Sequence, residues 1–108
     1  MTRRARRSVP DPRHLAALTG FARGYLHQDV IAEHGSVAGA AAAFCRDASP
    51  AERRALADAL QRVVEDARGW RAARLARFFE RLGAAWSPSS IDEVRELAGI
   101  ARRGDEVA

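Results

Sequence analysis

The sequence contains no lysine, one cysteine and few β-branched residues, and each shortage limits what the chain can be. Because Cys45 is the only cysteine, no disulfide can form within the chain, which suits a reducing compartment. Three isoleucines and two threonines in 108 residues are too few for a sheet of several strands. All 18 basic residues are arginine, which fits selection for bidentate anion binding or, the interpretation we favour, a GC-rich coding background.

Long apolar stretches are also missing. No segment approaches the roughly 20 apolar residues that a helix needs to span a bilayer. The start of the sequence, residues 1–13, is basic but is followed by no apolar run of signal-peptide length. We therefore expect a cytosolic protein that does not associate with membranes.

The excess positive charge is concentrated at the start of the sequence. The net charge is +4, and Arg3, Arg4, Arg6 and Arg7 supply four of the 18 arginines. The other 14 arginines are balanced by 14 acidic residues. We expect residues 1–10 to form a flexible basic arm on a neutral helical domain that covers residues 11–104. A DNA-binding domain usually carries its basic face on the folded part instead.

Apolar periodicity and capping signals predict five helices. Their expected ranges are 12–26, 36–46, 50–67, 70–82 and a last helix that starts at Ser90 and ends before Gly104. Capping boxes mark the third helix, through Ser49 and Glu52, and the fifth, through Ser90 and Glu93. The sequence therefore predicts an all-α fold, a compact bundle of about five short helices.

Three local expectations follow from the same patterns. Gly20 and Gly24 weaken the first helix, and two glycines on one helix often mark the close approach of another element. Arg53 and Arg54 fall on the side of the third helix that we expect to face water. Gly83 occupies the position of a C-cap glycine after the fourth helix.

The sequence carries no phosphate-binding glycine loop, zinc-ligand spacing or nucleophile elbow. One cluster of titratable residues, His27, Asp29, Glu33 and His34, could hold a divalent metal or act as acid and base. The alternative, which we favour, is that these side chains bond to backbone amides in the turn between the first two helices. We therefore predict no enzymatic activity, no metal site and no cofactor.

Arginines recur every three or four residues on the predicted fourth helix, at Arg71, Arg74, Arg77 and Arg81. Such a row could follow a phosphate backbone, so a small helical nucleic-acid-binding module that also uses the N-terminal arginine arm is our second hypothesis. The simpler interpretation of the row is an ordinary solvated face, which the zero net charge of the rest of the chain favours.

One segment resembles a known bacterial family. Gly24-Tyr25-Leu26-His27-Gln28-Asp29, then Glu33-His34-Gly35-Ser36 and Ala42-Ala43-Phe44, is similar to the contact-dependent growth inhibition immunity proteins of the small all-helical type. Leu82-Gly83, followed by Trp86 and Pro88, continues the resemblance, which covers about residues 14–101. It implies a protein that binds and neutralises a cognate contact-delivered toxin domain in the cytosol.

The resemblance also suggests where the functional residues lie. We interpret the motif residues as structural, fixing the turn between the first two helices: Tyr25, His27, Gln28, Asp29, Glu33, Gly35 and Ser36. The contact with the protein partner would then fall to exposed charged residues, for which Glu65, Asp66, Arg71 and Arg74 are our candidates.

Overall fold

The computed structural model describes residues 12–27 and 35–107, and these residues form five helices and no strand. The helices are α2 (Pro12–Tyr25), α4 (Val37–Asp47), α5 (Pro50–Asp66), α6 (Ala72–Arg81) and α7 (Ile91–Val107). The prediction of an all-α bundle is confirmed for this part of the chain. The predicted N-terminal arm lies outside the described residues.

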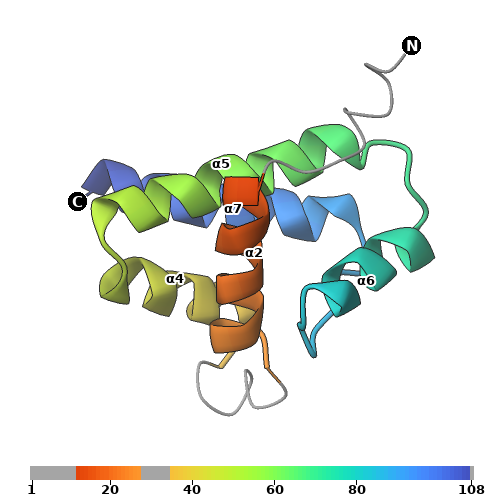
Figure 1. Ribbon diagram of the computed structural model, residues 1–108, viewed down its shortest axis with the longest axis horizontal. Helices are drawn as coiled ribbons and strands as arrows, with labels where there is room; N and C mark the ends of the chain where they lie inside the picture. Colours follow the sequence, from red (N-terminus) through yellow and green to blue (C-terminus); the bar gives the residue numbers. More distant parts are fainter. Residues whose placement is uncertain (1–11, 28–34, 108) are drawn as a thin grey trace.

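α5 and α7 form the centre of the bundle. They lie side by side and run in opposite directions, while α2 crosses α5 steeply and α4 packs against α7 (Figure 1). The largest fully buried side chains come from α2, α5, α6, α7 and the connections that follow α2 and α6: Phe21, Leu26, Leu56, Leu60, Phe79, Pro88 and Val94. α6 lies at one end of the molecule, and Leu75 and Phe79 anchor it to the shared core.

Local signals at the helix starts explain the observed boundaries. Ser49 accepts the amide of Glu52 at 3.1 Å, and the Glu52 side chain accepts the Ser49 amide at 2.8 Å, so the predicted capping box is present. At the start of α7 the expected box takes another form, because the Glu93 carboxylate accepts the amide of Ser89 at 2.7 Å. After α6, Gly83 has a φ of 98°, a conformation that glycine adopts without a steric penalty.

Three sequence-based expectations are corrected. α7 continues past Gly104 to Val107, because a single glycine costs about 1 kcal/mol without interrupting the hydrogen-bond ladder. Gly20 and Gly24 are exposed, and a Cβ at either position would meet nothing within 4 Å. None of the five described helices therefore packs over them; α2 buries Leu18, Phe21 and Ala22 instead. Arg53 does not face water, since only 6% of its surface is exposed.

Candidate functional site

The motif segment begins at the end of α2, where Tyr25 joins α2 to α4. Its ring lies 5.4 Å from that of Phe44 in an edge-on arrangement and 6.0 Å from that of Phe21 in a stacked one. Its hydroxyl donates a 2.8 Å hydrogen bond to Asp47, in the last turn of α4. Burial, together with the hydrogen bond and negative charge of Asp47, raises the pKa of Tyr25 above its ordinary value of 10.0.

The next residue, Leu26, ties the motif to a distant part of the chain. Its side chain is completely buried, and its carbonyl accepts the amides of Ala85 and Trp86 at 2.8 and 3.3 Å. These two residues belong to the connection between α6 and α7. Trp86 in turn lies edge-on to Phe79 of α6, with the ring centroids 6.0 Å apart. Sequence reasoning did not assign a role to Leu26, because its backbone contact depends on the tertiary fold.

Only part of the motif falls within the described residues. Its central residues, Gln28, Asp29 and Glu33, lie outside them, while His27 is half-buried just after α2. At the other end, Gly35 has a φ of 79°, and the Ser36 hydroxyl caps α4 by accepting the Gly39 amide at 2.9 Å. Among the residues that the structure places, no three His, Cys, Asp or Glu side chains gather as metal ligands would. Three of the four members of the alternative metal cluster, Asp29, Glu33 and His34, lie outside the described ranges.

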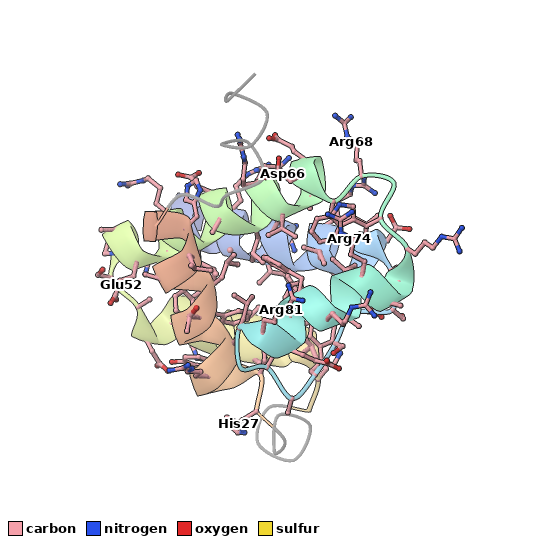
Figure 2. The ribbon with its side chains drawn as sticks, turned by 45° about the vertical axis from the view of Figure 1, so that its right-hand side comes forward. His27, Glu52, Asp66, Arg68, Arg74 and Arg81 are labelled. Carbon is pink, nitrogen blue, oxygen red and sulfur yellow. The ribbon has the colours of Figure 1, made fainter. Side chains whose placement is uncertain are left out.

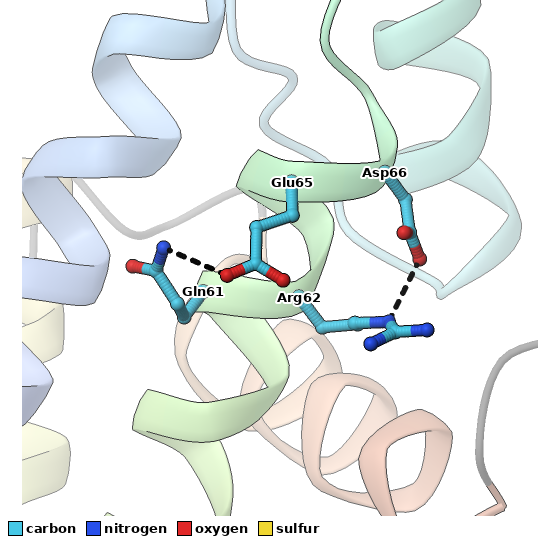
Figure 3. A network of polar contacts seen from close by, with 4 residues as sticks. All are labelled: Gln61, Arg62, Glu65 and Asp66. Atoms are coloured by element: carbon cyan, nitrogen blue, oxygen red, sulfur yellow. Dashed lines mark hydrogen bonds and ion pairs between the residues drawn. The ribbon is translucent and has the colours of Figure 1, made fainter.

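The two acidic candidates lie in the last turn of α5 and are exposed. Asp66 pairs with Arg62 at 3.2 Å, and Glu65 accepts a hydrogen bond from Gln61 at 3.4 Å (Figure 3). Gln61 also accepts a 3.3 Å hydrogen bond from Arg102 of α7. The polar side of α5 is thus partly occupied by contacts within the molecule.

The two basic candidates follow the acids along the chain, after the α5–α6 connection. Arg71 precedes the first residue of α6 and is exposed. The Arg74 guanidinium lies over the ring of Trp70, 4.1 Å from its centroid. Trp70 is half-buried and contacts Phe78 edge-on, with the ring centroids 5.9 Å apart. We call Glu65, Asp66, Trp70, Arg71 and Arg74 the connection surface; Figure 2 labels two of them, Asp66 and Arg74.

A row of arginines continues from this surface along α6. Arg71, Arg74, Arg77 and Arg81 are all exposed, whereas Leu75 and Phe79 of the same helix are buried. Arg74, Arg77 and Arg81 share one side of the helix because residues three or four apart are neighbours on its surface. We call these four residues the α6 arginine ridge. Figure 2 labels Arg74, in the first turn of α6, and Arg81, at its last residue.

Arg53 is a structural residue that sequence reasoning missed. Its Nη1 donates to the carbonyls of Cys45 and Ala48, at 3.1 and 2.7 Å, at the end of α4. The Cys45 carbonyl would ordinarily receive the Ser49 amide, but that amide is bonded to Glu52. Arg53 therefore supplies the missing donor at the negative end of the α4 dipole. Nearby, burial raises the pKa of the Cys45 thiol, which fits a packing role.

Comparison with known proteins gives one match. A model of the CdiI immunity protein family matches residues 14–98, most of the chain. The chain belongs to the CdiI immunity protein family. The match includes the motif segment, the connection surface and all of α6. Neither the curated proteins nor the solved structures that were compared with the chain give a match.

Membership of the CdiI family identifies the function of the chain, which is to neutralise a contact-dependent toxin. This confirms the function that the motif resemblance implied. The family implies a protein toxin as the partner, and it gives no support to the hypothesis of a nucleic-acid-binding module. Within the described ranges, no helix of this CdiI protein has both the length and the apolar character to cross a membrane.

Proposed function

We propose that this CdiI protein neutralises its toxin by forming a stoichiometric complex in the cytosol, without catalysis, and that the connection surface makes the central contact. The observation that carries the proposal is the stacking of Arg74 on Trp70 at 4.1 Å, with exposed Arg71 between them in the sequence and exposed Glu65 and Asp66 in the last turn of the preceding helix. Tryptophan and arginine are the residues most enriched at the energetic centres of protein interfaces.

The connection surface is also suitably rigid for this role. Phe78 packs against Trp70 at 5.9 Å in a T-shaped arrangement, and the Trp70 ring restrains the Arg74 side chain, so less side-chain entropy is lost on binding. The charged residues around the pair include both signs, which provides selectivity between partners because mismatched charges repel. A binding protein needs such a preformed surface and no reactive group.

The test compares the Arg71→Ala/Arg74→Ala double variant with an Arg95→Ala/Arg103→Ala control on α7. Both pairs are exposed arginines, so the change in charge is the same. We expect the first variant to bind the toxin domain encoded beside this chain at least about 30-fold more weakly, the weakening typical of an interface centre. The control should bind within a few-fold of the wild type. Isothermal titration calorimetry measures both the affinity and the stoichiometry.

Cells that express the toxin domain provide the functional measurement. Protection should require about one immunity protein for each toxin molecule, because each immunity protein stays bound to the toxin molecule that it neutralises. Full protection by a small fraction of that amount would contradict the non-catalytic mechanism. If the wild-type protein neither binds the toxin domain nor protects the cells, complex formation itself is wrong. If it does both and the double variant behaves like the control, only the assignment to the connection surface is wrong.

A further inference from the structure

The charges of the α6 arginine ridge have few partners within the molecule. Among the ion pairs between described residues, which link Arg62 to Asp66 and Arg95 to Asp92, none involves a ridge arginine. The only acidic residue of α6 is Glu80, so four arginines share the helix and its N-cap with one carboxylate. This concentration of charge contrasts with the chain beyond its first seven residues, where 14 arginines balance 14 acids.

The ridge is held on a well-anchored helix. Leu75 and Phe79 are 2% and 1% exposed, and Trp86 closes over Phe79 from the following connection. The arginine heads therefore project from a fixed backbone while their own contacts with carboxylates are few. Binding an anionic surface would require no internal ion pair to be broken, which removes one cost of association.

Resting on the proposed function, we infer that the toxin domain presents an acidic surface to the α6 arginine ridge, next to the contact made by the connection surface. Arginine suits this contact because its planar guanidinium binds a carboxylate through two parallel hydrogen bonds. Opposite charge on the two partners would also raise the association rate by electrostatic steering.

A protein surface fits the ridge better than a nucleic acid does. Glu80 shares α6 with the ridge, and Glu65 and Asp66 end the preceding helix, so negative charges close to the ridge in the sequence would repel a continuous row of phosphates. The Arg74 guanidinium covers one face of Trp70, so that face is closed to a stacking base. Spaced carboxylates on a folded partner avoid both conflicts.

The absence of lysine from the sequence allows a direct test. Arg77→Lys and Arg81→Lys each introduce a single side-chain amine and keep the positive charge. In the complex with the adjacent toxin domain, a carbodiimide should join that amine to a toxin carboxylate as an amide, which mass spectrometry can locate. Arg103→Lys is the matched control, because it lies near the end of α7, at the end of the molecule away from α6 (Figure 1).

Charge reversal provides the second measurement. We expect Arg77→Glu/Arg81→Glu to weaken toxin binding at least tenfold in 0.15 M salt, with a smaller difference at about 0.5 M because screening shortens the range of the charges. Arg46→Glu/Arg103→Glu carries the same change in charge on α4 and α7 and should bind within about threefold of the wild type. Circular dichroism confirms that all variants are folded.

The outcomes separate this inference from the proposed function. Cross-links from positions 77 and 81 together with salt-dependent weakening support an acidic toxin surface at the ridge. A wild-type complex without these cross-links, or one that charge reversal leaves unchanged, overturns the inference and leaves the immunity function intact. Loss of duplex DNA binding on charge reversal, with unchanged toxin binding, also overturns it, in favour of a nucleic-acid face. A wild-type protein that binds no toxin removes the proposed function itself.

Discussion

Replacing Arg53 by methionine tests whether this buried arginine stabilises or destabilises the fold. Arg53 is 6% exposed, and its guanidinium contributes two hydrogen bonds to the end of α4, but its Nε has no partner. No carboxylate pairs with it in the ion pairs between described residues. Methionine keeps the length and most of the apolar stem, so the substitution isolates the charged head.

The magnitude follows from two opposing effects. Hydrogen bonds to a charged group contribute about 1.5–3 kcal/mol each, and since both come from one nitrogen we count about 4 kcal/mol for the pair. Removing the charge recovers the desolvation cost of the buried, unpartnered Nε, about 1–3 kcal/mol. We therefore expect Arg53→Met to lower the free energy of unfolding by about 2 kcal/mol. For a domain near this size that corresponds to a drop in Tm of about 10 °C.

Urea unfolding followed by far-UV circular dichroism measures the change, with an unaltered m value confirming that only stability has changed. Arg62→Met is the control, because it removes an exposed pair on the same helix and should cost only about 0.3–0.5 kcal/mol. If Arg53→Met is as stable as the wild type or more so, desolvation outweighs the two hydrogen bonds. The role assigned to Arg53 would then be wrong.

Three further predictions concern single features of the fold. Gly20→Ala should stabilise the protein by up to about 1 kcal/mol, because alanine is the better helix former and its Cβ would meet nothing within 4 Å. Gly83→Ala should destabilise it, because φ is 98° at this position and a Cβ would lie 3.0 Å from the Arg23 Cγ. Thermal melts of the two variants beside the wild type measure both changes. Ser49→Ala should cost about 1 kcal/mol through loss of the capping box, measured by urea unfolding against Ser87→Ala. Tyr25 is the only tyrosine, so an alkaline ultraviolet titration reports it alone, and its midpoint should lie above 10.0. Because folding raises the pKa of Tyr25, the stability that its protonated hydroxyl contributes is fully present below pH 10.0 and is lost as the pH rises through the pKa of the folded state. Tyr25→Phe should abolish this loss of stability at high pH. An equal loss in both proteins would contradict the prediction.

The helices were predictable where local chemistry sets them. α5 was expected over 50–67 and runs from Pro50 to Asp66, because its start depends on Ser49, Pro50 and Glu52, which are adjacent in the sequence. α6 was expected from residue 70 but begins at Ala72, since Arg71 provides no side-chain cap and the preceding residues form a turn. Where no strong local signal exists, tertiary packing decides the boundary.

The toxin-contacting role of Glu65, Asp66, Arg71 and Arg74 stays a prediction, but their placement on the fold could be expected from the sequence. The four residues flank one short connection, which follows from the predicted helix boundaries. The stacking of Arg74 on Trp70 was not predicted, because it depends on rotamers that the packing of Phe78 fixes. The burial of Arg53 was missed for a related reason. Helical periodicity describes one helix, whereas the end of α4 covers Arg53 only in the tertiary structure.

The contacts of Tyr25 and Leu26 lead to a distinction between the family motif and the toxin-binding surface. The Leu26 carbonyl accepts two amides from the connection that follows α6, so a change at the motif would displace α6 together with its arginines. Motif variants should therefore lose toxin binding in proportion to a loss of stability, whereas ridge variants should lose it at unchanged stability. Measuring Kd and the free energy of unfolding on the same variants separates the two groups. A Tyr25→Phe protein that is fully stable yet binds toxin poorly would instead place the motif in the interface.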